Sequence, residues 1–370
     1  MISVPVFDLD RALEEIREEL DERWRSILES KHFVGGAEVG EFECAFAGLA
    51  GSADCVGVGN GTDALILALK ALGAGSGDEV VVPAFTFAAT AATVEWVGAL
   101  PVFADVEAAT LNLDPERLEA AITERTVGVI GVHLYGQPCA LKPIQEICRG
   151  AGLWLIEDAA QAHGARYRER PVGAFGDLAT WSFYPSKNLG CFGDGGAVTG
   201  GDSDAVTRVR LLANHGAPRR YEHVLVGTNS RLDAFQAAVL NCRLVSLEAK
   251  NRRRAEIAER YQRGLAGARG VVCLATDDRS EPVYHQMTVL ADRRDELQAF
   301  LAERGIGSTV HYPTALPDQA AFASSDGIRG DCPVARRAAS EVLCLPMFPE
   351  LSDAEADLVI TAVREFAAGA

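Results

Sequence analysis

The chain has 370 residues, of which 48% are hydrophobic, and its 52 acidic and 35 basic side chains give a net charge of −17 at pH 7. This length can bury a large core and predicts two domains, or one large domain with an appendage. An acidic chain repels phosphate backbones at long range, which argues against nucleic-acid binding. Neither a long apolar stretch nor a basic leader is visible, so we expect a cytoplasmic protein that spans no membrane.

The nine cysteines are dispersed along the chain and form neither a Cys-x-x-Cys pair nor a short cluster with histidine. An odd, scattered set of this kind is typical of reduced and mostly buried thiols. We therefore expect neither a disulfide framework nor a zinc site, and no metal in the functional site.

The N-terminal region predicts a helix from about Asp10 to Lys31, because apolar side chains recur there at helical spacing between charged residues. These apolar positions are Leu13, Ile16, Leu20, Trp24, Ile27 and Leu28. The pattern indicates a helix with one face in solvent.

Short apolar runs rich in β-formers follow, separated by segments with helical patterns. The runs cover residues 55–58, 79–82, 100–103, 127–132, 153–156 and 178–183. Strands that are apolar on both faces and alternate with helices are typical of a parallel sheet covered on both sides. The sequence therefore predicts an α/β fold.

The C-terminal part has a different pattern of predicted helices and strands. After Asp233 the pattern indicates one long helix to about Leu265, and we interpret its basic run at 250–254 as a solvated helix face, with a binding patch as the alternative. A strand over 283–290, a helix over 294–303 and two closing helices follow. We expect a large domain over residues 1–249 and a smaller α+β domain over 250–370.

Lys187 is the first candidate for chemistry. It follows Pro185 and Ser186 and stands just ahead of the glycine-rich stretch 193–196. A lysine amine becomes nucleophilic only where its surroundings favour the neutral form, and a cofactor aldehyde can then capture it. The alternative is that Lys187 is an ordinary solvated cation. The neighbouring residues must therefore distinguish a reactive amine from a solvated one.

Asp158 ends the fifth predicted strand, the place where α/β sheets commonly hold ligands. Taken alone, this carboxylate could simply cap a helix. Together with a reactive lysine it fits pyridoxal phosphate chemistry, in which a buried carboxylate keeps the ring nitrogen protonated and the ring withdraws electrons from the substrate Cα.

A glycine-rich turn at 57–61 follows a strand and opens an apolar helix. The backbone amides at that helix start and the hydroxyl of Thr62 form a natural phosphate cradle. A dinucleotide-binding turn is the alternative, but Thr62 replaces the third glycine of GxGxxG and the acidic pair Asp78-Glu79 precedes the next strand instead of ending it. A purely structural turn also remains open.

Two further runs follow strands. The first carries Phe85 and Phe87, which could stack on a flat heterocycle or pack in the core. The second, His133 to Pro138, could supply polar contacts to a ligand. All these candidates fall at one edge of one predicted sheet, and this convergence favours a binding site there.

These segments, taken in order, resemble the DegT/StrS family of sugar aminotransferases, pyridoxal phosphate enzymes with the aspartate-aminotransferase fold. The matching motifs are GTDAL (61–65), PAFTFAAT (83–90), HLYGQP (133–138), EDAAQAHG (157–164), SFYPSKNLG (182–190), GDGGA (193–197) and GTNSRLD (227–233). The resemblance covers about residues 5 to 350 and implies fold type I, in which a mostly parallel seven-stranded sheet forms the large domain.

The resemblance also implies the roles of the residues around the cofactor, pyridoxal 5′-phosphate, which alternates with pyridoxamine phosphate. Lys187 would bond to the cofactor and carry the Cα proton, and Asp158 would pair with the ring nitrogen. Other residues would hold the ring and the phosphate. These are Phe87 stacked on the ring, Gln161 at the ring hydroxyl, and Thr62, the Asp63 amide, Ser182 and a second subunit's Asn229 at the phosphate.

For the substrates, the resemblance implies a homodimer with shared active sites. Tyr184, His311 and Tyr312 would lie near the diphosphate of a nucleotide-linked keto sugar, joined by Arg219 and Arg220 of the second subunit. Adjacent arginines suit bidentate phosphate contacts; their alternative is an exposed loop. Arg231 would bind the carboxylate of the donor, L-glutamate, which leaves as 2-oxoglutarate, or would form a structural ion pair with Asp233.

The residues around Lys187 are more similar to members that aminate carbon 3 of a dTDP- or UDP-linked hexose than to those acting at carbon 4. Such members make amino and deoxy sugars for antibiotics or polysaccharides. Dehydratase relatives carry histidine in place of the lysine, so Lys187 disfavours that outcome. Two other classes remain open: a nicotinamide-dependent oxidoreductase, which lacks its fingerprint here, and a non-catalytic regulator, against which the intact Lys187, Asp158 and Ser182 count.

Overall fold

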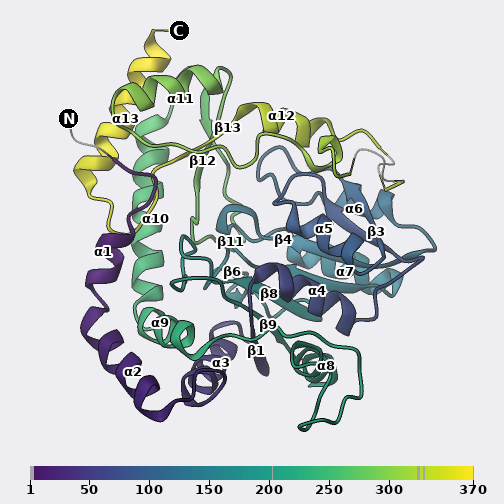
Figure 1. Ribbon diagram of the computed structural model, residues 1–370. Helices are drawn as coiled ribbons and strands as arrows, with labels where there is room; N and C mark the ends of the chain where they lie inside the picture. Colours follow the sequence, from purple (N-terminus) through teal and green to yellow (C-terminus); the bar gives the residue numbers. More distant parts are fainter. Residues whose placement is uncertain (1–3, 202, 323–325, 328–329, 370) are drawn as a thin grey trace.

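A seven-stranded sheet forms the centre of the large domain (Figure 1). The computed structural model describes residues 4–201, 203–322, 326–327 and 330–369. The strands of this sheet are β1 (Asp54–Val58), β2 (Glu79–Pro83), β3 (Leu100–Ala104), β4 (Thr126–Val132), β5 (Trp154–Asp158), β8 (Leu178–Ser182) and β9 (Gly196–Gly200).

The spatial order of the strands is β1-β9-β8-β5-β4-β2-β3. Strand β9 runs antiparallel to both of its neighbours, and the other pairs are parallel. The predicted α/β class and the mostly parallel sheet are confirmed. The short strand β9 was not predicted, because its β-branched pair, Val198 and Thr199, is flanked by small residues and glycine.

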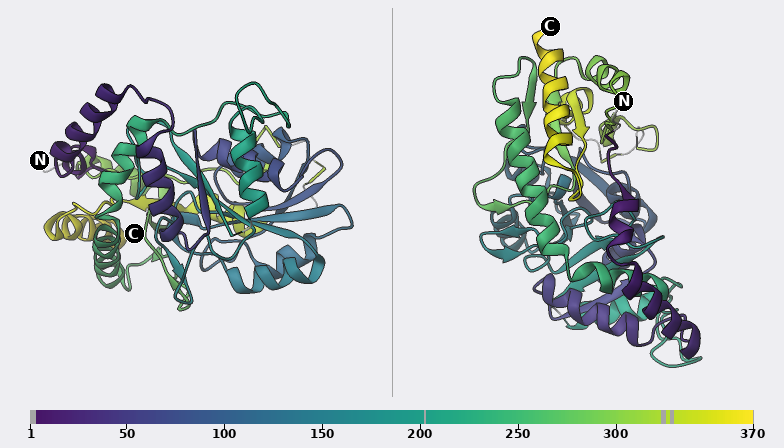
Figure 2. Two further views of the ribbon diagram at one scale, coloured as in Figure 1. Left: turned by 90° about the horizontal axis from the view of Figure 1, so that it is seen from below. Right: turned by 90° about the vertical axis from the view of Figure 1, so that its left-hand side faces the viewer.

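Helices cover both faces of this sheet (Figure 2, left). Neighbouring residues of a strand point to opposite faces, so Val81 packs in one buried cluster while Val80 and Val82 pack in another. The helices on the Val81 side are α3 (Ala37–Leu49), α6 (Pro115–Ala121), α7 (Leu141–Ala151) and α9 (Ala234–Leu244). Those on the other side are α4 (Gly61–Ala71), α5 (Ala89–Trp96) and α8 (Ser203–Ala213).

The two helices predicted to be continuous are each broken. The N-terminal one is α1 (Leu9–Glu14) and α2 (Arg17–Ser30), and the later one is α9 followed by α10 (Leu247–Leu265). The break in the first falls at Ile16, which is itself buried. Apolar periodicity continues across such a break, so the pattern could not reveal the change of direction.

The small domain contains an antiparallel sheet in the order β10-β12-β13. Its elements are β10 (Val271–Cys273), β12 (Met287–Ala291), β13 (Val342–Leu345), α11 (Arg294–Glu303), α12 (Pro333–Glu341) and α13 (Asp353–Ala368). The helix predicted over 294–303 is confirmed. The strand predicted over 283–290 begins only at Met287, because Val283 and Gln286 donate backbone hydrogen bonds to the large domain instead.

The expected domain boundary at residues 249–250 falls inside α10. Leu247 packs in a large-domain cluster, whereas Ile257 packs in the small-domain cluster. Val4 belongs to the same small-domain cluster and forms a parallel bridge with Ile306. The beginning of the described chain therefore packs with its end, as Figure 1 shows beside α13.

The basic run 250–254 is only partly a solvated helix face. Lys250 pairs with Glu15 at 2.8 Å, and the buried Arg254 donates to the Met347 carbonyl at 3.0 Å. An arginine can bury its stem and still satisfy its donors on backbone oxygens. The prediction of a solvated face is therefore wrong for Arg254.

The remaining elements are short. They are β6 (Arg166–Tyr167), β7 (Arg170–Pro171), β11 (Ser280–Glu281) and the single 3₁₀ turns at Leu134–Gly136 and Leu316–Asp318. All nine cysteines are free, and only Cys44 is exposed, as the dispersed pattern predicted. None of the helices within the described ranges is long and apolar enough to cross a bilayer.

Candidate active site

The predicted site residues converge where several parallel strands end. Strand β2 leads to Phe87, β5 ends at Asp158 and β8 ends at Ser182, while helix α4 begins at Gly61 on the same edge. Ligands of open α/β sheets bind outside the carboxyl ends of the strands, and the convergence predicted from the sequence has this form.

Lys187 lies in a loop that connects β8 with β9. Its amide donates to the Tyr184 carbonyl at 2.8 Å, and Arg243 secures the far side of the loop by donating to the Gly190 carbonyl at 2.6 Å. A Cβ at Gly190 would lie 2.6 Å from the Pro185 carbonyl oxygen, so only glycine allows this close turn. The loop therefore holds Lys187 in a defined place.

The electrostatics of Lys187 favour a reactive amine. Burial lowers the pKa of Lys187 to about 8, against a smaller raising effect of the nearby Asp158 carboxylate. A pKa near neutrality leaves an appreciable neutral fraction of the amine at pH 7 to 8, which an ordinary lysine lacks. The structure thus supplies the environment that the sequence argument required.

Asp158 is buried, with only 7% of its surface exposed. Thr90 donates its hydroxyl proton to one carboxylate oxygen at 3.0 Å, and the Ala160 amide approaches the other at 3.3 Å. Burial raises the pKa of Asp158, while the hydrogen bond from Thr90, the Ala160 amide and the charge of Lys187 oppose that rise. A buried carboxylate with so few donors is suited to a cationic N–H partner.

Three imidazoles near Lys187 carry no charge at neutral pH. Burial lowers the pKa of His163 to about 3, with a further lowering from Lys187, and the His163 ring packs at a tilt against the aromatic rings of Trp181 and Phe183. Burial and Lys187 also lower the pKa values of His285 and His311. These histidines therefore add no positive charge to compete with Lys187 for Asp158.

Helix α4 begins directly beside the end of β8. A Cβ at Gly61 would lie 2.7 Å from the Ser182 Cβ, so glycine is required for this contact. The exposed Thr62 follows at the start of the helix, where the first backbone amides lack intrahelical acceptors. This arrangement matches the predicted phosphate cradle.

The predicted role of Asp63 meets competition inside the chain. Its amide donates to the Asn60 side chain at 2.8 Å, and its carboxylate accepts from the Ser230 hydroxyl at 2.6 Å. The amides of Gly61 and Thr62 are the alternative donors at this helix start. The Asp63 amide is therefore a weaker phosphate ligand than the sequence suggested.

Aromatic and amide side chains form a second group of candidate residues. Phe87 is 56% exposed, and its ring centroid lies 5.9 Å from that of Tyr312. Gln161, which is 9% exposed, donates from Nε2 to the Tyr312 hydroxyl at 3.3 Å. The Tyr135 amide donates to Gln161 Oε1 at 2.6 Å, which fixes the NH₂ end of Gln161 toward the site.

The predicted substrate residues are divided between two places. Tyr184 is 55% exposed and lies three residues before Lys187, while His311 and Tyr312 lie next to each other with ring centroids 5.5 Å apart. Arg219 pairs with Glu222 at 3.7 Å, and Arg220 stacks on Tyr221 at 4.9 Å, in the exposed loop after α8. The structure of one chain does not bring these two arginines to its own lysine.

Asn229 and Arg231 occupy the same connection. The exposed Asn229 forms a bridge with Asn214, and the next residue, Ser230, contacts Asp63 of the same chain. Arg231 donates to the Asn214 side chain at 3.1 Å, and the described residues show no ion pair between it and Asp233. The polar loop thus lies beside the phosphate cradle with side chains available to a second chain.

Sequence reasoning missed the supports beneath the site. Thr90 was noted only as part of a motif, and its hydroxyl lies 3.4 Å from that of Thr86 in the segment before α5. Buried Glu157 accepts from His133 at 3.2 Å and from the Gly173 and Phe175 amides. Burial raises the pKa of Glu157, but these hydrogen bonds outweigh it and hold the pKa below its usual value. His133 is thus a structural residue.

The residues present fit pyridoxal phosphate. One edge of the sheet carries an exposed phenyl ring, a buried carboxylate, a lysine with a lowered pKa and the start of α4, where Gly61 contacts Ser182. The flat ring, the ring nitrogen, the aldehyde and the phosphate of that cofactor each have a matching partner among them. Phe87 is otherwise a large apolar side chain left in solvent.

The chain is similar to known aminotransferases over nearly its whole length. The model of the DegT/DnrJ/EryC1/StrS aminotransferase family matches residues 14–364. A dTDP-3-amino-3,4,6-trideoxy-alpha-D-glucose transaminase of Streptomyces venezuelae is 46% identical over 98% of this chain and 96% of that protein. A pleiotropic regulatory protein of Geobacillus stearothermophilus is 42% identical over 99% of both chains.

A solved structure is also closely similar. The crystal structure of S. venezuelae DesV in complex with a ketimine intermediate superposes with a TM-score of 0.97 at 45% identity, covering 99% of each chain. This likeness extends to both domains, since it leaves only 1% of either chain unmatched.

Proposed function

The chain belongs to the DegT/DnrJ/EryC1/StrS aminotransferase family, and we propose that it transfers an amino group from L-glutamate to carbon 3 of a nucleotide-linked keto sugar. One observation carries the chemistry: a lysine with its pKa lowered to about 8 lies in the same site as a buried carboxylate. The name of the relative that makes a dTDP-linked 3-amino sugar supports the choice of acceptor.

In this proposal each side chain has a separate task. Bound pyridoxal phosphate supplies an aldehyde that takes the amino group and a cationic ring that withdraws electrons from the substrate Cα. Lys187 tethers the cofactor and moves the proton at that Cα, and Asp158 keeps the ring nitrogen protonated. Phe87 stacks on the ring and Gln161 donates to its hydroxyl.

The phosphate end is held by the start of α4, Thr62 and Ser182, with Asn229 of a second copy of the chain. The diphosphate of the sugar nucleotide would lie against Tyr184, His311 and Tyr312. A chain with a net charge of −17 needs local positive charge to hold a diphosphate, and Arg219 and Arg220 of the second copy would supply it. Arg231 would receive the carboxylate of glutamate.

The proposed assembly is a homodimer with two shared sites, located in the cytoplasm. The observation behind it is the connection after α8, where Tyr221, Val224 and Val226 are exposed to between 55% and 97%. Large apolar side chains gathered on one polar loop are typical of a surface that another chain covers.

The direct test is a panel of dTDP- and UDP-linked 3-keto and 4-keto hexoses with glutamate as donor. Mass spectrometry would detect the amino sugar, and 2-oxoglutarate would report turnover. Amination of a 3-keto sugar supports the proposal. Turnover restricted to 4-keto sugars would replace the carbon-3 assignment, and no turnover with any of them would overturn the acceptor class.

A regulator on the same fold is the second candidate, because the Geobacillus relative carries that name. The intact Lys187 and Asp158 argue for catalysis, since a regulator needs neither a reactive amine nor a buried carboxylate beside it. Binding of a DNA operator without transamination would favour the regulator. A nicotinamide-dependent oxidoreductase is disfavoured by the family membership.

Thr90→Val is expected to lower turnover about tenfold to 100-fold, the effect of losing one hydrogen bond to a charged group. The Thr90 hydroxyl opposes the rise in the pKa of Asp158, so its loss lets that pKa rise further. The acidic limb of the pH profile should therefore move to higher pH. Thr93→Val is the matched control, because the buried Thr93 hydroxyl donates to the Thr90 carbonyl at 3.3 Å and forms no hydrogen bond with the Asp158 side chain within the described part of the chain. Equal pH profiles for both variants would contradict the assignment.

Mixing two inactive variants tests the shared site. Asn229→Ala should weaken cofactor binding, and Lys187→Ala should abolish activity. In a mixed dimer, the site that keeps Lys187 receives the intact Asn229 from the other chain. One of the two sites is therefore complete, and the mixed dimer should have about half of the wild-type activity. If Asn229 acts within its own chain, the mixed dimer contains no complete site and no activity returns. Native mass spectrometry would confirm that mixed dimers have formed.

A further inference from the structure

A single stretch of the small domain passes over the candidate site. We call residues 309–316 the crossing segment. Its first residue, Thr309, exchanges two backbone hydrogen bonds with Cys344 of β13, at 2.8 and 3.1 Å, and its last, Leu316, donates to the Ala84 carbonyl at 2.9 Å. His311 and Tyr312 lie between these anchors. The segment is therefore fixed at both ends, and its middle carries two of the expected substrate residues.

Tyr135 holds the middle of the crossing segment. Its hydroxyl donates to the His311 carbonyl oxygen, and the residue is 5% exposed. At the other end of the same residue, the Tyr135 amide donates to Gln161 Oε1 at 2.6 Å, and its carbonyl accepts from the Gln286 amide at 3.3 Å. One buried residue thus joins the cofactor-facing glutamine, the crossing segment and the strand entering β12.

The backbone around Tyr135 has little freedom. Tyr135 has a φ of 59°, a left-handed conformation that a bulky residue rarely adopts, and Gly136 follows with a φ of 89°. A Cβ at Gly136 would come within 2.9 Å of both the Gln161 carbonyl oxygen and the His285 amide. The turn is therefore locked between the two domains, and the direction of the tyrosine side chain is set by its backbone.

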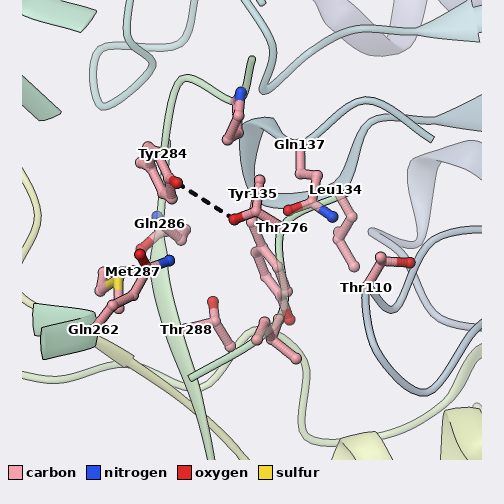
Figure 3. Close-up of a pocket in the computed structure, with 12 residues that line it drawn as sticks. Thr110, Leu134, Tyr135, Gln137, Gln262, Thr276, Tyr284, Gln286, Met287 and Thr288 are labelled. Carbon is pink, nitrogen blue, oxygen red and sulfur yellow. Dashed lines mark hydrogen bonds between the residues drawn. The ribbon is translucent and has the colours of Figure 1, made fainter. Parts of the chain in front are cut away.

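The ring of Tyr135 has free space beside it. It lines a pocket between the domains, shown in Figure 3, with Leu134, Gln137 and Thr110 on one side and Gln286 and Thr288 on the other. The free volume is about 30 Å³, which is room for one or two water molecules. Tyr135 packs in a large-domain core cluster that leaves this small space open, and the hydrogen bond to the His311 carbonyl adds a fixed point that ring packing does not supply.

We propose that Tyr135 is a positioning residue for the keto-sugar acceptor: its hydroxyl places the crossing segment, and with it His311 and Tyr312, over the site. The proposal rests on the proposed function, because it assigns these two residues to the sugar nucleotide. The amino donor is assigned to Arg231, which has no contact with Tyr135 among the described residues. The two half-reactions should therefore respond differently when the hydroxyl is removed.

Tyr261 offers a matched control within the small domain. Its buried hydroxyl also donates to a backbone carbonyl, that of Pro346 at 3.1 Å, and its ring packs in the small-domain core as that of Tyr135 packs in a large-domain cluster. Tyr135→Phe and Tyr261→Phe each remove one such hydrogen bond and leave the ring in place. A purely structural effect would be shared by both variants.

The experiment follows the two half-reactions separately in the holoenzyme, through the absorbance of the bound cofactor. Tyr135→Phe should lower the efficiency of the keto-sugar half-reaction about fivefold to tenfold, mainly through KM, and change the glutamate half-reaction less than about twofold. Tyr261→Phe should change neither by more than about twofold. Equal losses in both half-reactions of Tyr135→Phe, or an unchanged keto-sugar half-reaction, would overturn the proposal.

A second measurement does not depend on any substrate. Hydrogen exchange followed by mass spectrometry should show faster exchange of the crossing segment in Tyr135→Phe, and unchanged exchange there in Tyr261→Phe. If the wild-type enzyme accepts no nucleotide sugar, the proposed function fails while this measurement still decides whether Tyr135 places the segment. Unchanged exchange of residues 309–316 in Tyr135→Phe would overturn the positioning role.

Discussion

Lys187→Ala is expected to abolish transamination, with turnover falling by roughly four orders of magnitude or more, because one amine both tethers the cofactor and moves the Cα proton. The measurements are the rate of 2-oxoglutarate formation and the absorbance of the bound cofactor. Added methylamine should restore part of the proton transfer, since a small amine can occupy the space of the missing side chain. Turnover close to that of the wild type would refute the mechanism.

The pH dependence of Lys187 provides an independent check on the same residue. Burial lowers its pKa to about 8, so capture of pyridoxal phosphate by the apo chain should reach half of its maximal rate near pH 8. The unfolded chain binds this proton up to the ordinary lysine pKa of about 10.4. Between about pH 8 and pH 10.4, the free energy of unfolding of the wild type should therefore rise relative to that of Lys187→Ala.

A suitable control for Lys187→Ala is Lys142→Ala. Lys142 pairs with Glu146 at 3.2 Å on the exposed face of α7, and a surface pair of this kind contributes little to stability. Both variants remove one lysine charge from the protein. Only the loss of Lys187 should change the cofactor absorbance. A half-maximal capture rate near the ordinary lysine pKa would contradict the described burial of the amine.

Asp158→Asn is expected to lower turnover by about 100-fold to 1000-fold, the range found when a preorganised electrostatic partner is removed from an active site. Asparagine keeps the shape of the side chain but removes the charge that would hold the ring nitrogen protonated. The slow step should become removal of the Cα proton, so exchange of the Cα deuterium of labelled glutamate with solvent is the measurement that isolates it.

The control for this variant is Asp177→Asn. Asp177 accepts from the Leu155 amide at 2.8 Å, near the opposite end of β5 from Asp158. Asp177→Asn also removes one carboxylate charge beside β5, but it leaves the candidate site unchanged. Similar exchange rates for Asp158→Asn and the wild type would show that the carboxylate does not act on the ring.

The place of the candidate residues could be predicted in part from the strands. Asp158 was found as the end of a predicted strand and Lys187 through its flanking residues, whereas Ser182 was named only by the family resemblance. The parallel sheet places the ends of β5 and β8 at one edge. Strand β9 was missed because only Val198 and Thr199 of its five residues favour a strand, which is too short a run to give a periodic signal. Its place between β1 and β8 depends on partners that lie far away in the sequence.

The supporting contacts could not be predicted, since they join residues separated by long stretches of chain. Thr90 and Asp158 are 68 positions apart, and Tyr135 and His311 are 176 positions apart. Nothing in the local sequence around Thr90 or Tyr135 indicates which oxygen atom the hydroxyl of that residue will reach. The break at Ile16 was hidden for a different reason, because the buried face continues through it.

The loop that carries Lys187 begins and ends on neighbouring strands, since Ser182 of β8 pairs with Gly196 of β9. Its two ends are therefore held at the spacing of adjacent strands, about 4.8 Å, and move only together with the large sheet. The crossing segment, in contrast, begins at β13 of the small domain. A hinge motion between the domains would consequently pull on the large-domain anchors of this segment, Ala84 and Tyr135, while the point of cofactor attachment stays at rest.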